Sequence, residues 1–129
     1  TRTSWRRALR VMPARLRVRL QDVEPRSESI SESITRVRLR RAGLRVDVQV
    51  RLAPGIRVDL LVGQRVVVEL EGFAFHGSRA QFESDRRREA VITGLGYSVL
   101  RFSYHQVMDD WPSVLRSVRA ALRTTRRIA

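Results

Sequence analysis

Residues 59–71 read D-L-L-V-G-Q-R-V-V-V-E-L-E, and this stretch decides the fold. Two short runs of Val and Leu flank a Gly-Gln pair, a pattern typical of two antiparallel strands joined by a tight turn. Asp59 lies in the first run, and Glu69 and Glu71 end the second. Because side chains alternate between the faces of a strand, Glu69 and Glu71 point the same way. If the two runs pair as a hairpin, Asp59 can lie close to them, and three convergent carboxylates suit a hard cation such as Mg²⁺.

The residues around this hairpin predict two further strands. Val and Leu alternate with polar residues over 46–52, as in a half-buried antiparallel strand. The runs at 57–62 and 65–70 are more uniformly apolar, which predicts central strands buried on both faces. A similar run at 97–102 follows a helical segment, so we expect this strand to lie parallel to its neighbour.

Helical patterns flank the strands, and we expect helices over 29–42, over 78–93 and from 110 onward. The capping-box patterns S-I-S-E (29–32) and S-R-A-Q (78–81) open the first two, and Gly43 ends the first. Asp-Trp-Pro opens the last, which has an apolar stripe at helical spacing. The order helix, three strands, helix, strand, helix predicts an α/β domain with a mixed sheet flanked by helices.

Composition restricts the partners that this domain can have. With 129 residues the chain is long enough for one core, and its 26 basic and 13 acidic residues give a net charge of +13. Such a charge attracts polyanions, so nucleic acid is the expected partner. The chain has no cysteine, which fits a reducing compartment, and we expect a cytoplasmic protein. No apolar run reaches the length of a membrane span, so no membrane partner is expected.

The first 26 residues form a separate Arg-rich segment, and the domain proper is expected over 27–129. Apolar residues recur at helical spacing over 1–20, and Pro13 divides this stretch into two short helices or starts the second. The segment is either a sequence-independent binder of a nucleic-acid backbone or the remnant of an upstream domain. Because the chain starts with Thr1, we expect it to be part of a longer protein.

Three spaced motifs carry a family resemblance over about 29–122. They are E-L-E-G-F-A-F-H at 69–76, F-E-S-D-R-R-R at 82–88 and G-Y-S-V-L-R-F-S at 96–103. Together with the order of elements, they resemble the restriction-endonuclease-like PD-(D/E)xK fold with its αβββαβ(α) core. More narrowly, they are similar to the domain of unknown function 559 family, which belongs with the very-short-patch-repair endonucleases.

The resemblance implies roles for four residues. Asp59 and Glu69 would bind a divalent cation, Mg²⁺ or Mn²⁺, that polarises the scissile phosphate and activates a water. Glu71 stands where many relatives have lysine, and it would ligate the cation or act as a base. His76 matches a histidine that acts as an acid or base in the repair enzymes. The alternatives are salt bridges from Glu69 and Glu71 to the many arginines, and a His76 that caps the next helix or packs beside Phe73 and Phe75.

The remaining candidates lie on helices and on the last strand. Glu32 matches a helix glutamate that lies near the metal pocket in this family, but it is also explained as the N3 partner of Ser29 in a capping box. Arg86, Arg87 and Arg88 cover nearly a full turn, so one of them is expected to face the active site and contact a phosphate. The alternative is a solvated helix face paired with neighbouring acids. Arg101 is a further candidate for phosphate contact.

Three functions are compatible with these observations. The first is a metal-dependent DNA endonuclease; the second is a DNA-binding regulatory module that cleaves nothing, since some proteins of this family carry a winged-helix region resembling toxin–antitoxin regulators. The third is a basic RNA- or ribosome-associated protein, and the positive net charge is the one sequence feature that supports it. The acids favour the first, because three carboxylates facing a polyanion would weaken a pure binder. Double-strand cleavage by this fold usually needs two active sites, so a dimer is expected to cut both strands and a monomer to nick one.

Overall fold

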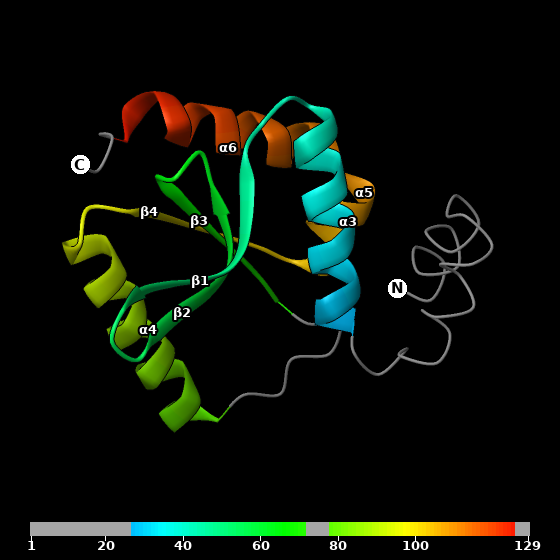
Figure 1. The fold of residues 1–129 in the computed structure, drawn as a ribbon. Coiled ribbons are helices and arrows are strands. Elements are labelled where there is room, and N and C mark those ends of the chain that lie inside the picture. The colour runs from blue at the N-terminus through cyan, green and yellow to red at the C-terminus, as the bar shows by residue number, and fades with distance from the viewer. Residues whose placement is uncertain (1–26, 72–77, 126–129) are drawn as a thin grey trace.

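The computed structural model describes residues 27–71 and 78–125, and within these ranges four strands form a mixed sheet (Figure 1). In spatial order the strands are β1 (Val46–Ala53), β2 (Ile56–Val62), β3 (Val66–Leu70) and β4 (Ser98–Phe102). The first three pair antiparallel, whereas β4 lies parallel to β3. The four predicted strands and the parallel direction of the last one are therefore confirmed.

Helices cover both faces of this sheet. α3 (Ser27–Arg41), α5 (Tyr104–Asp109) and α6 (Trp111–Thr124) pack on one face, where they share the larger apolar core with β2 and β3. α4 (Arg79–Gly94) lies on the other face, and only Ile92 of this helix is buried. Figure 1 shows α4 on the opposite side of the strands from α6. The predicted α/β architecture is confirmed, and α4 is the thinly packed layer. None of the helices in the described ranges is long and apolar enough to cross a membrane.

The helix ends test the capping predictions. Ser78 caps α4 by accepting a hydrogen bond from the Gln81 backbone N–H at 3.1 Å, which confirms the predicted N-cap, whereas the Gln81 side chain donates to Asp85. The capping box at Ser29 is wrong: α3 already begins at Ser27, so Ser29 lies inside the helix and Glu32 is not its N3 residue. α5 was not predicted from the sequence, because six residues are too few to show a helical period.

The β1–β2 hairpin turns from one face of the sheet to the other. Val46 belongs to the larger core, whereas Val50, which strand alternation would place on the same side, packs in the smaller core below α4. Gln49 lies between them with φ of 51°. In β2 the same change occurs between Val58 and Leu60, and Figure 1 shows β1 leaving α3 and bending toward α4. The prediction that 46–52 presents a single apolar face is therefore wrong.

β3 is the most buried element of the described sheet. Val66, Val67 and Val68 are all fully buried, which confirms a central strand enclosed on both faces. Leu70, the last residue of β3, is buried as well, and Glu69 is the one half-buried residue of this strand. Because β3 is tightly packed on both faces, the position of Glu69 near its end is fixed.

Candidate functional site

Glu69 lies at the centre of the candidate site because of the strand register. On one side, Glu69 is the direct partner of Arg101 in the parallel β3–β4 ladder. On the other side, the last pair of the β2–β3 ladder is Leu60 and Val68, so the next positions along the two strands are Asp59 and Glu69. The predicted hairpin is confirmed, and it puts Asp59 and Glu69 on adjacent strands. That these two acids converge with Glu71 on a cation stays a prediction.

Both carboxylate oxygens of Glu69 are held by arginines. Arg88 reaches from α4, and its Nη1 donates to Glu69 Oε1 at 2.6 Å. Arg101 Nη2 donates to Glu69 Oε2 at 3.0 Å. Arg88 also donates through Nη2 to the backbone carbonyl of Arg57 in β2, so this one side chain connects α4 to two strands.

Glu89 is a site residue that the sequence analysis did not select. It accepts hydrogen bonds from Arg101 and, at 2.6 Å, from Arg86 Nη1. Arg86 thus pairs with an acid of its own helix, as in the alternative to phosphate contact, whereas the contact of Glu89 with Arg101 crosses from α4 to the sheet. We call Glu69, Glu89, Arg86, Arg88 and Arg101 the ion-pair cluster. From the sequence D-R-R-R-E at 85–89, only ion pairs within the helix could be expected.

The charges of the ion-pair cluster act most strongly on Arg101. Burial of its guanidinium lowers the pKa of Arg101, but the carboxylates of Glu89 and Glu69 outweigh burial, and the pKa is raised above its usual value. Arg101 therefore stays charged and is stabilised by two acids. Its position at the end of β4 confirms that it faces the same part of the sheet as Glu69.

The other predicted acids lie around this cluster with different partners. Asp59 Oδ1 accepts a hydrogen bond from Gln49 Nε2 at 3.2 Å, at the bend of the β1–β2 hairpin. Glu71 is half-buried, and its N–H donates to the carbonyl of Phe102 at 2.9 Å, which extends the β3–β4 pairing by one residue. Strand alternation places Glu71 on the same face as Glu69.

The remaining candidates are less closely connected. Glu32 is half-buried on α3, the helix that covers the face opposite α4. Arg87 is exposed on α4. His76 and the helices expected over 1–20 lie outside the described residues. Within 27–71 and 78–125, no three His, Asp or Glu side chains gather closely enough to form a ready metal-binding group.

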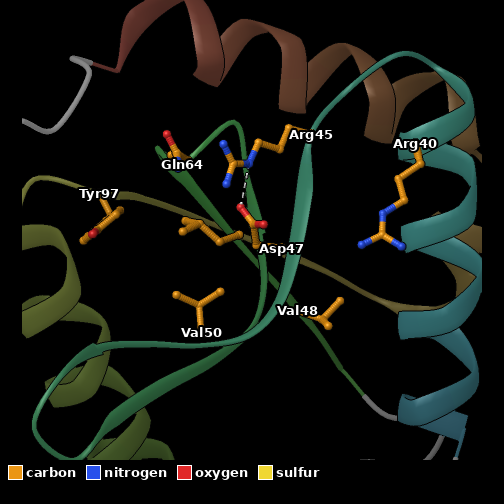
Figure 2. Close-up of a pocket in the computed structure, with 8 residues that line it drawn as sticks. Arg40, Arg45, Asp47, Val48, Val50, Gln64 and Tyr97 are labelled. Carbon is orange, nitrogen blue, oxygen red and sulfur yellow. Dashed lines mark hydrogen bonds and ion pairs between the residues drawn. The ribbon is translucent and has the colours of Figure 1, made fainter.

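A groove of about 690 Å³ lies near the start of β3, away from Glu69 at its end (Figure 2). It is lined by polar and apolar side chains: Arg40, Arg45, Asp47, Val48, Val50, Leu61, Gln64 and Tyr97. Among these residues, Arg45 Nε donates to Asp47 Oδ2 at 3.1 Å, and Arg40 Nη2 donates to the carbonyl of Val46 at 2.7 Å. The groove is therefore bordered by two arginines and one aspartate, and none of its lining residues belongs to the ion-pair cluster.

Comparisons with known proteins agree with this architecture. The family model REase_MTES_1575 matches residues 32–122, and the chain belongs to this restriction-endonuclease-like family. The fold is similar to that of the catalytic domain of the homing endonuclease I-Bth0305I, with a TM-score of 0.60 and 17% identity. The match covers 73% of this chain and 94% of that domain. No curated protein sequence matches the chain. The predicted restriction-endonuclease-like fold is thereby confirmed.

Proposed function

We propose that this protein is a divalent-metal-dependent DNA endonuclease in which Asp59 and Glu69 bind the cation. The observation that carries the proposal is the register: in a chain of the restriction-endonuclease-like family, Asp59 and Glu69 lie on the two central strands, each one position beyond the last paired residues, Leu60 and Val68. Carboxylate oxygens are the donors that Mg²⁺ and Mn²⁺ prefer, so the residues present fit such an ion. A bound cation would polarise a phosphate and lower the pKa of a water.

The chain's own residues divide the remaining work. We propose that Glu71, which strand alternation puts on the face of Glu69, completes the ligand set or accepts a proton from the attacking water. His76 is proposed as an acid or base in the loop that follows, and Glu32 as an outer ligand from α3. These three roles rest on the resemblance to the very-short-patch-repair branch of the superfamily, which is part of this proposal.

DNA is the proposed substrate. The net charge of +13 supplies long-range attraction to a polyanion. Close to Glu69, the arginines of α4 and β4 supply guanidinium donors of the kind that bind phosphate in pairs. Arg87 is exposed, and Arg86 is 44% exposed although it pairs with Glu89. We propose that these side chains, with Arg88 and Arg101, hold the phosphate backbone beside the acids.

One observation favours the alternative, a DNA-binding module that does not cleave. Both oxygens of Glu69 are occupied by arginines, and an acid that serves only as a counter-charge for Arg88 and Arg101 would look the same. In that function the basic surface binds DNA, and the acids merely keep α4 in place on the sheet.

Cleavage of supercoiled plasmid in Mg²⁺ or Mn²⁺ separates the two functions. Nicking or linearisation that disappears in EDTA and in Glu69→Gln, but persists in the exposed-acid control Glu83→Gln, would support the nuclease. Plasmid that is bound but remains uncut, together with no heat of Mn²⁺ binding in calorimetry, would rule the nuclease out and leave the binding module.

A further inference from the structure

Phosphodiester hydrolysis places extra negative charge on the phosphate oxygens, and a positive donor aimed at this charge lowers the barrier. The acids proposed for the site cannot supply such a donor. Within the described residues, the cations that contact Glu69 are Arg88 and Arg101. Besides the proposed divalent cation, one of these two side chains is the candidate for a positive donor from the protein itself.

Arg88 and Arg101 differ in how firmly they are held. Arg101 is bound by two carboxylates, those of Glu69 and Glu89, and its side chain is 22% exposed. Arg88 has a single carboxylate partner among the ion pairs of the described residues, Glu69, and its side chain is 32% exposed. The other contact of Arg88 is to a backbone carbonyl, that of Arg57. Arg88 is thus the less constrained of the two.

A cation that binds Glu69 must compete with both arginines, because each holds one of its two oxygens. When the carboxylate turns to a cation, Arg101 keeps its second partner, Glu89. Arg88 loses Glu69, its one carboxylate partner within 27–71 and 78–125, and its long side chain at the surface of α4 can then bind another anion. The nearest anion in a substrate complex is the phosphate beside the same acids.

From these contacts, and on the basis of the proposed function, we infer that Arg88 alternates between two anions. Without a divalent cation it neutralises Glu69. When a cation takes Glu69, Arg88 moves to the scissile phosphate and supplies the positive charge that stabilises the developing anion. Cation binding and phosphate binding are coupled through this one side chain, whereas Arg101 stays bound to Glu89 throughout.

The release of Arg88 can be tested without any metal. In EDTA, Glu69→Gln removes the carboxylate that holds Arg88, and we expect it to bind a short DNA duplex about tenfold more tightly than the wild type. Most of this gain should disappear in Glu69→Gln/Arg88→Gln. The exposed acid Glu83 is the matched control: the smaller gain from Glu83→Gln should be unaffected by Arg88→Gln. An equal gain from Glu69→Gln with and without Arg88 would overturn the inference.

The competition itself is measured by Mn²⁺ calorimetry without DNA. Arg88→Gln removes one competitor, so we expect Mn²⁺ to bind about tenfold more tightly, with no change in Arg119→Gln, an exposed arginine on α6. If Arg88 had only a structural role, Arg88→Gln would leave the Mn²⁺ affinity unchanged or weaken it. Either result would refute the competition between Arg88 and the cation. If Mn²⁺ binds neither the wild type nor the variants, the proposed nuclease fails, and the EDTA experiment still decides whether Glu69 restrains Arg88.

Discussion

The turn between β2 and β3 permits a quantitative test of how α6 is packed on the sheet. Gly63 has φ of +58°, and a Cβ built there would lie 2.6 Å from Leu122 Cδ2 on α6. In Gly63→Ala, the left-handed backbone costs about 1–2 kcal/mol. Displacement of the Leu122 side chain adds about 1 kcal/mol, at the low end for overpacking because this side chain is half-buried and can shift. We expect a total loss of about 2–3 kcal/mol, or about 10–20 °C in Tm.

Gly55 provides the matched control, since it has φ of +76° but nothing within 4 Å of its built Cβ. Gly55→Ala should therefore lose only the backbone contribution. Urea unfolding of both variants measures the difference, and in a Leu122→Ala background that difference should vanish. Equal losses for Gly63→Ala and Gly55→Ala in the wild-type background would refute the close packing of α6 against the turn.

Three further predictions concern the charged and polar groups. Glu89→Gln leaves Arg101 with Glu69 as its carboxylate partner in the cluster. In urea unfolding, this variant should lower the free energy of unfolding by about 1–3 kcal/mol. The control variant Glu83→Gln, at an exposed acid, should change it by less than about 0.5 kcal/mol. Burial raises the pKa of Tyr104 to about 12, above the value of about 10 in an unfolded chain. As pH rises, the unfolded state therefore loses this proton first. The free energy of unfolding should fall by about 2–3 kcal/mol between about pH 10 and pH 12. Tyr104→Phe should lack that fall in unfolding measured across the alkaline range, and an identical pH profile would contradict the assignment. If the groove contacts DNA, Arg45→Gln should weaken binding to all sequences alike and reduce the salt dependence by about one phosphate contact in fluorescence anisotropy; an unchanged slope would place the groove outside the interface.

Local patterns were sufficient for most of the fold. The four strands and three of the helices follow from the period of apolar residues and from turn and cap residues, all of which act over a few positions. α5 and the bend at Gln49 did not follow from them. A six-residue helix shows no period, and a positive φ at a residue other than Gly has no reliable sequence signal.

The candidate site was predicted in part. The sequence located the acids on the second and third strands, and the register puts Asp59 and Glu69 each one position beyond the last paired residues, Leu60 and Val68. It did not show that Glu89 belongs to the site. Glu89 contacts Arg101 across the space between α4 and the sheet, and such a contact depends on how a helix is docked rather than on neighbouring residues.

By itself, the amino-acid sequence determined the order of the four strands and the three longer helices, the large positive charge and the placement of Asp59 and Glu69 on adjacent strands. Only the tertiary structure decided which cations hold Glu69, because Arg88 lies 19 residues and Arg101 lies 32 residues further along the chain. Strand alternation sets the face on which a carboxylate lies. The guanidinium that meets it is set by the packing of α4 and β4 around β3, which no local pattern encodes.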